Sequence, residues 1–186
     1  WDFAEKNNLE LIAYELSLKN LNSIEPSDEF LSYAPAISKA YIYSRDLIEK
    51  FPQNYFFGIL FLECLIQTGQ DEKAEILFYK LEEDFDFLTP IQKDWYFSYY
   101  KYEWALYQFF HGNEYESLLC VEEAINNYHA ELDIVLGNAW LLKGMIHDRI
   151  GERDDAIKAY QVCVSLDNHS AAMEKAMKYL DLPFTD

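Results

Sequence analysis

The chain is poor in the residues that make long loops. Its 186 residues include only 6 glycines and 5 prolines, so the sequence favours long helices joined by tight corners. The 3 cysteines are widely spaced, with no CxxC pair and no histidine at metal-ligand spacing. We expect Cys64, Cys120 and Cys163 to be buried thiols in a reducing environment.

Positive charge is also scarce. The 15 Lys and Arg residues are outnumbered by 33 Asp and Glu residues, which gives a net charge of −18. Nucleic acids and anionic membranes are bound by clustered basic side chains, so both are excluded as partners. The acidic run Glu82-Glu83-Asp84 with Asp86 is typical of a solvated helix end, and a site for a basic partner is the alternative.

No apolar run is long enough to cross a bilayer. The most apolar run, Phe56–Ile66, is interrupted by Glu63 and is shorter than the roughly 20 residues required. The chain begins at Trp1, with no Met and no signal-peptide pattern. We therefore expect a fragment of a longer, cytoplasmic protein. An exported or periplasmic protein is the alternative, since a signal could have been trimmed away.

Apolar and aromatic side chains are abundant. Hydrophobic residues make up 51% of the chain, with 13 Phe and 15 Tyr, so the chain can bury a core and disorder is excluded. GxSxG, HExxH, Walker and GxGxxG motifs do not occur. We expect no enzyme, no catalytic or metal-binding residues and no cofactor. His129 with Glu131 and Asp133 matches no metal motif, and an ordinary helix junction is the simpler interpretation.

Three glycines mark an internal repeat. Each is followed by a small residue five positions on, a bulky residue nine positions on and another packing residue twelve positions on, which is one face of an α-helix. A small residue on that face lets a neighbouring helix approach closely. After Gly69, Gly112 and Gly151, the small residues are Ala74, Ser117 and Ala156, the bulky residues are Phe78, Val121 and Tyr160, and the third packing residues are Leu81, Ala124 and Cys163.

Each of these glycines also follows a long apolar segment, Tyr55–Thr68, Pro90–His111 or Glu131–Ile150. Glycine after the last turn of a helix can take the left-handed conformation that ends it. Repeated helix, glycine corner and helix predict an array of helical hairpins.

Residues 139–168, AWLLKGMIHDRIGERDDAIKAYQVCVSLDN, resemble the tetratricopeptide repeat (TPR) family. The segment departs from the family pattern at Lys143, where an apolar residue is usual, at His147, where an aromatic is usual, and at Asn168, where Pro is frequent. The matching residues are Trp140, Gly144, Gly151, Ala156, Tyr160 and the closing Leu166-Asp167.

The resemblance implies an all-α fold, a right-handed superhelix of antiparallel helix hairpins with about nine helices (a TPR-like α-solenoid). It covers residues 54–168 and extends loosely over 1–52. We expect a single TPR-like domain over residues 1–186. Its units are 1–52 (degenerate), 54–86, 90–129, 131–168 and a closing helix over 169–182.

Cap signals predict where the helices begin. Expected first residues or caps are Pro35, Asn54, Thr89 before Pro90, Asn113 and Ser170. A further helix is expected over Phe3–Leu21.

In TPR arrays the first helix of each hairpin lines the concave surface, and the resemblance implies the same here. The groove would be apolar and aromatic, and its carboxylates would pair with a basic peptide or amphipathic helix. The expected groove residues are Phe56, Ile59, Glu63 and Ile66, then Tyr99, Tyr102, Glu103, Leu106 and Phe109, then Asn138, Leu141, Met145 and Asp148. Some TPR domains hold a C-terminal carboxylate with Lys, Arg and Asn, but those positions are Ile59, Glu63, Tyr102 and Leu141 here, so that clamp is absent.

The segment Trp95–Phe110 is apolar nearly all round. One interpretation is a central helix enclosed by its neighbours, and the other is a groove floor that contacts a partner. The sequence leaves both open, and different faces of one helix could serve each.

These observations favour a non-catalytic scaffold that binds a protein or peptide. The alternative is a self-association or structural module, whose groove is filled by a homodimer partner or by the rest of the chain. A small-molecule pocket between the helices over 90–111 and 131–150 is a third hypothesis, supported only by aromatic richness.

Overall fold

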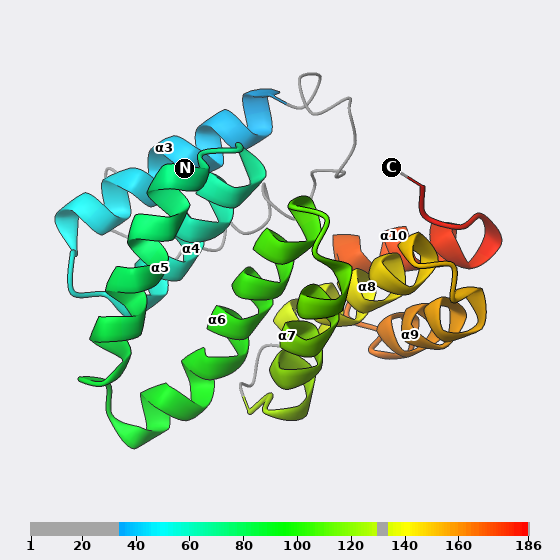
Figure 1. The fold of residues 1–186 in the computed structure, drawn as a ribbon. Coiled ribbons are helices and arrows are strands. Elements are labelled where there is room, and N and C mark those ends of the chain that lie inside the picture. Colours follow the sequence, from blue (N-terminus) through cyan, green and yellow to red (C-terminus); the bar gives the residue numbers. More distant parts are fainter. Residues whose placement is uncertain (1–33, 130–133, 186) are drawn as a thin grey trace. The chain divides into compact units, whose positions relative to one another are not determined.

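The computed structural model describes residues 34–129 and 134–185, which form eight α-helices and no strands (Figure 1). The all-α prediction is confirmed over these residues. The helix predicted over Phe3–Leu21 lies outside them, as do Glu131 and Asp133. The helices are α3 (Ala34–Lys50), α4 (Tyr55–Gln67), α5 (Asp71–Phe85), α6 (Pro90–Phe110), α7 (Glu114–Asn126), α8 (Ile134–Arg149), α9 (Arg153–Ser165) and α10 (Ala171–Asp181).

The chain divides into two compact units, Trp1–Phe87 and Leu88–Asp186, which are described separately. In the first, α3 packs on α4 and α4 packs on α5. In the second, each helix from α6 to α10 packs on the next, and α8 also contacts both α6 and α10. These sequential contacts are those of helical hairpins packed one after another.

Two helix starts are fixed by side-chain caps at the expected residues. Asn54 accepts a hydrogen bond from the backbone N–H of Phe57 at 3.2 Å, which caps α4. Thr89 and Gln92 form a reciprocal capping box at the start of α6, with Pro90 in its first turn. Local sequence therefore determines where the long aromatic helix begins.

The two remaining predicted caps differ from each other. Ser170 accepts a hydrogen bond from the N–H of Met173 at 3.2 Å and caps α10 as expected. Asn113 occupies the N-cap position of α7 but forms no side-chain cap. Its amide instead donates to Oε1 of Gln108 at 2.8 Å, across the corner between α6 and α7.

The three corner glycines all have left-handed backbone conformations, with φ of 63° at Gly69, 71° at Gly112 and 84° at Gly151. This confirms the prediction that they end helices. Each corner is a Schellman motif, in which the N–H after the glycine bonds to a carbonyl five residues earlier. These bonds join Gln70 to Leu65 (3.0 Å), Asn113 to Gln108 (2.9 Å) and Glu152 to His147 (2.8 Å).

The predicted packing positions of the hairpins are all buried. The small residues Ala74, Ser117 and Ala156 have no exposed surface. The Ser117 hydroxyl donates to the backbone carbonyl of Ala105 at 2.7 Å, which shows how closely α7 approaches α6. The same offsets thus define the interior of all three hairpins.

Glycines in the first helices of two hairpins allow still closer contact. A Cβ at Gly144 would lie 2.2 Å from Cε1 of Tyr160, so the tyrosine ring lies directly against the backbone of α8. In the other unit, a Cβ at Gly58 would lie 2.8 Å from Cδ2 of Leu81.

No helix in the described part of the chain combines the length and the apolar character that crossing a membrane requires.

Candidate functional site

The predicted groove residues lie on α4, α6 and α8. Helix α4 belongs to the first unit and α6 and α8 to the second, so each set is described within its own unit. Most are buried, and only Phe56, Asn138 and Asp148 are partly exposed as whole residues. The buried residues are Ile59, Glu63, Ile66, Tyr99, Tyr102, Glu103, Leu106, Phe109, Leu141 and Met145.

The aromatic helix α6 is enclosed along much of its length. Tyr99, Tyr102, Tyr107 and Phe109 are buried, while Trp95 near its start is exposed. Burial raises the pKa of Tyr99 to about 12, because the charged phenolate is disfavoured away from water. Of the two interpretations of this segment, the burial in the described structure favours the enclosed helix.

The three carboxylates expected to pair with a basic partner are withdrawn from solvent. Glu63 is buried and accepts a hydrogen bond from Gln67 at 3.0 Å. Glu103 is buried on α6, and the Asp148 side chain is only 1% exposed. A salt bridge between these groups and a partner would require existing packing to open.

Asp148 is the centre of a polar network inside the second unit. Its carboxylate accepts hydrogen bonds from the Tyr160 hydroxyl at 2.9 Å and from the backbone N–H of Phe184 at 2.8 Å. Nη1 of Arg153 donates to both of its oxygens at 3.0 Å. Burial, followed by the hydrogen bond to Asp148, raises the pKa of Tyr160 above its usual range. Asp148 therefore holds α8, α9 and the segment after α10 together.

Two arginines connect different parts of the second unit. Nη2 of Arg153 donates to the carbonyls of Tyr179 and Leu180, at 2.7 and 2.9 Å. The Arg149 guanidinium lies 3.7 Å from the centroid of the Phe109 ring and donates to the Phe109 carbonyl at 2.7 Å. These contacts explain Arg149 and Arg153 as structural residues of the second unit.

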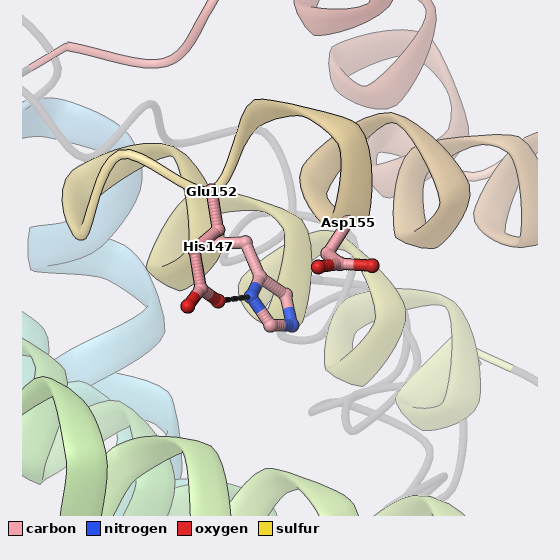
Figure 2. A group of neighbouring side chains, drawn as sticks. All are labelled: His147, Glu152 and Asp155. Atoms are coloured by element: carbon pink, nitrogen blue, oxygen red, sulfur yellow. Dashed lines mark hydrogen bonds and ion pairs between the residues drawn. The ribbon is translucent and has the colours of Figure 1, made fainter.

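A second polar group lies at the corner between α8 and α9 (Figure 2). Nδ1 of His147 lies 2.9 Å from Oε2 of Glu152, and an oxygen of Asp155 completes a group whose three ligand-type atoms lie within 4.8 Å of one another. Figure 2 shows the imidazole between the two carboxylates. These residues offer one nitrogen and two oxygen donors, a set that divalent metals accept.

Two lysines lie near this group. Nζ of Lys158 is 2.7 Å from Oδ1 of Asp155. Lys158 lowers the pKa of Asp155, mainly through this hydrogen bond and then through its positive charge. Lys143 forms a salt bridge of 2.8 Å with Glu122 and adds a smaller electrostatic effect at Asp155. Any cation bound at the corner would compete with Lys158 for Asp155.

The outward faces of α5 and α7 expose large apolar side chains. Ile76 and Tyr79 on α5 are each 70% exposed, and Tyr115 and Leu119 on α7 are 76% and 60% exposed. Exposed carboxylates flank both pairs. They are Glu72, Glu75 and Glu83 on α5 and Glu116 and Glu123 on α7.

Neither the corner group nor the exposed apolar faces correspond to a motif in the sequence. The sequence does not indicate His147, Glu152 and Asp155 as a site, because their spacing matches no metal motif. The one available signal was the glycine corner, which brings the last turn of one helix next to the first turn of the next. The exposed apolar faces lie on α5 and α7, the second helices of their hairpins, whereas the resemblance predicts the groove on the first helices.

Comparisons of the chain with protein-family models, with curated proteins and with solved structures found no match. The TPR resemblance therefore rests on the residues of this chain alone.

Proposed function

We propose that this protein is a non-catalytic, TPR-like scaffold, a right-handed superhelix of helix hairpins that binds a basic amphipathic segment of another protein. The hairpin contacts, the three Schellman corners and the buried small residues support this architecture. One fold serves many functions, so the binding proposal rests on the exposed side chains rather than on the architecture.

The observation that carries the proposal is the pairing of exposed apolar residues with carboxylates on α5 and α7. Residues 72, 76, 79 and 83 follow helical spacing, so Glu72, Ile76, Tyr79 and Glu83 share one face of α5. Single exposed apolar residues are common, but neighbouring ones mark binding surfaces more often. A partner helix with apolar residues flanked by Lys or Arg would match both the exposed apolar pair and the carboxylates of this face.

The test is selection of random peptides displayed on phage against the purified protein, repeated with two variants. Ile76→Ser/Tyr79→Ser removes the exposed pair of α5, and Tyr115→Ser/Leu119→Ser removes that of α7. We expect wild type to enrich basic amphipathic peptides, and at least one variant to lose them while its circular dichroism spectrum stays unchanged. No enrichment, or equal enrichment by all three proteins, would reject the proposal.

The aromatic groove remains a predicted binding site that the same selection distinguishes. Tyr102 and Leu106 are buried on α6, so Tyr102→Asp/Leu106→Asp should lose helical structure. If this variant instead folds normally and loses the selected peptides, the partner binds in the groove. Self-association is recognised by light scattering, since a dimer broken by the α5 or α7 variant would place a second copy on these faces.

A further inference from the structure

The corner between α8 and α9 gathers side chains that the scaffold role does not require. We propose that His147, Glu152 and Asp155 bind a divalent transition-metal ion of the Zn²⁺ type. His147 lies on the last turn of α8, Glu152 directly follows the corner glycine, and Asp155 lies on the first turn of α9. The two helices and their Schellman corner therefore supply all three ligands.

The distances match a site that needs only a small adjustment. Zn²⁺ binds N and O ligands at about 2.0–2.2 Å, which places the ligands of a tetrahedral site roughly 3.4 Å apart. Nδ1 of His147 and Oε2 of Glu152 are already 2.9 Å apart. Asp155, within 4.8 Å of both, is half-exposed and can rotate toward them. The metal ion replaces the proton in the His147–Glu152 hydrogen bond.

The histidine is held in place before any ion binds. Its side chain is only 10% exposed, whereas that of Glu152 is 51% exposed. The backbone N–H of Glu152 also donates to the His147 carbonyl at 2.8 Å, which fixes the relative position of the two residues. A buried imidazole facing two accessible carboxylates allows an ion to enter from solvent and leaves one position for water.

The donor set selects the class of metal. Mg²⁺ and Ca²⁺ prefer sites made of oxygen ligands alone, whereas an imidazole nitrogen favours Zn²⁺ and its transition-metal neighbours. The competing salt bridge between Lys158 and Asp155 is exposed on both sides, so little is lost when the ion displaces the lysine.

The corner between α6 and α7 provides an internal comparison. There, Gln108 and Asn113 take the positions of His147 and Glu152, and their side chains form a hydrogen bond of 2.8 Å. Two amides thus connect the ends of this Schellman corner, where the other corner has an imidazole and a carboxylate. The corner of α8 and α9 has the same backbone hydrogen bond but carries His147 and Glu152 at these positions, while Asp155 stands where the other corner has Glu116.

The comparison supplies the decisive variant, His147→Gln/Glu152→Asn, which transfers the amide pair to the α8–α9 corner. Metal-stripped protein without an affinity tag is titrated with ZnCl₂ by calorimetry, and its melting temperature is measured with and without the ion. We expect wild type to bind one Zn²⁺ and to melt at a higher temperature with it. The variant should melt like metal-free wild type, and its affinity for Zn²⁺ should be lower by about tenfold or by a larger factor.

Two further variants test the third ligand. Asp155→Asn should weaken Zn²⁺ binding, and Lys158→Ala should strengthen it by freeing Asp155. Mg²⁺ should give no heat at concentrations where Zn²⁺ saturates the protein. The proposal is overturned if wild type does not bind Zn²⁺, or if the His147→Gln/Glu152→Asn variant binds it equally through the exposed His111, His129 or His169. In either case His147 and Glu152 only connect the two helices, as Gln108 and Asn113 do.

Discussion

The hairpins α4/α5 and α8/α9, one from each unit, apply the same repeat in different ways. In α4/α5, Ile66 lies three residues before the corner glycine and Phe78 nine residues after it, and both are buried and apolar. In α8/α9, the same two positions are Asp148 and Tyr160, which are joined by a hydrogen bond. The repeat therefore specifies which positions are buried, whereas their chemistry differs between hairpins. One is held by apolar packing and the other also by a buried charge.

The largest effect is predicted for removal of the buried carboxylate of Asp148. Asp148→Ala leaves the Tyr160 hydroxyl, the Phe184 N–H and part of the Arg153 guanidinium without their acceptor, and should lower the free energy of unfolding by about 3 kcal/mol. Urea unfolding followed by tryptophan fluorescence measures this change, because Trp95, Trp104 and Trp140 all belong to the second unit.

Asp155→Ala is the matched control for this prediction. Asp155 belongs to the same helix pair but is exposed, so its loss should change the free energy of unfolding by less than about 0.5 kcal/mol. If the two variants unfold alike, Asp148 does not hold the second unit together.

The next effect compares the two close-approach glycines. Gly144→Ala places a methyl group against the rigid ring of Tyr160, and overpacking should lower the free energy of unfolding by about 2 kcal/mol. Gly58→Ala meets the flexible end of Leu81, and alanine's helix propensity, worth about 1 kcal/mol, should largely offset the contact.

Hydrogen exchange of the amides in α4/α5 and α8/α9 measures both glycine variants by one method. We expect faster exchange throughout α8/α9 in Gly144→Ala. In Gly58→Ala, exchange in α4/α5 should change little. Equal acceleration in the two would mean that the flexibility of the facing side chain does not decide the effect.

The corner glycines should behave alike in both units. Gly69→Ala and Gly151→Ala introduce no contact within 4 Å, so backbone strain alone should lower stability by about 1 kcal/mol in each. Asn at either position should be milder because it tolerates the left-handed region. Hydrogen exchange of the adjoining helices checks this, and a much larger loss at Gly151 would show that its corner has an additional structural role.

The smallest effect at neutral pH concerns the thiols of the second unit. Burial, the main cause, raises the pKa of Cys120 to about 11 and that of Cys163 to about 12. The native state therefore retains these protons more strongly than the unfolded chain. The contribution of the two thiols to the free energy of unfolding is fully present below the ordinary pKa of 9.0 and is lost as the pH rises toward 11 and 12.

A thiol-reactive dye provides the measurement. At pH 8 the folded protein should react very slowly and the urea-unfolded protein rapidly, with unfolding at lower urea concentrations above pH 9. Fast reaction of Cys163 in the folded protein would contradict its burial.

Much of the secondary structure was predictable because the signals are local. Thr89-Pro90 specifies a helix start through a capping box and a fixed φ, and Gly151 specifies an end because only a residue without Cβ takes φ of 84° without strain. Asn113 lies at the expected N-cap position, but its Oδ1 accepts no hydrogen bond from a backbone N–H of α7. Its amide nitrogen donates to the side chain of Gln108, on the preceding helix, and the cap signal in the sequence does not reveal this partner.

The candidate site was less predictable, because exposure and ligand geometry depend on residues distant in sequence. Tyr99 and Leu106 look equally suited to a groove and to a core, and only packing against other helices distinguishes the two. His147 acquires its neighbours through the corner, which no linear motif describes.

The sequence by itself determined the helices, their glycine corners and the positions that face each hairpin interior, because caps, φ angles and helical spacing act within a few residues. Only the tertiary structure decided that Asp148 is an internal acceptor and that Ile76 and Tyr79 are exposed. The partners of Asp148 include Phe184, thirty-six positions along the chain, and such a contact depends on how the helices pack rather than on any local pattern.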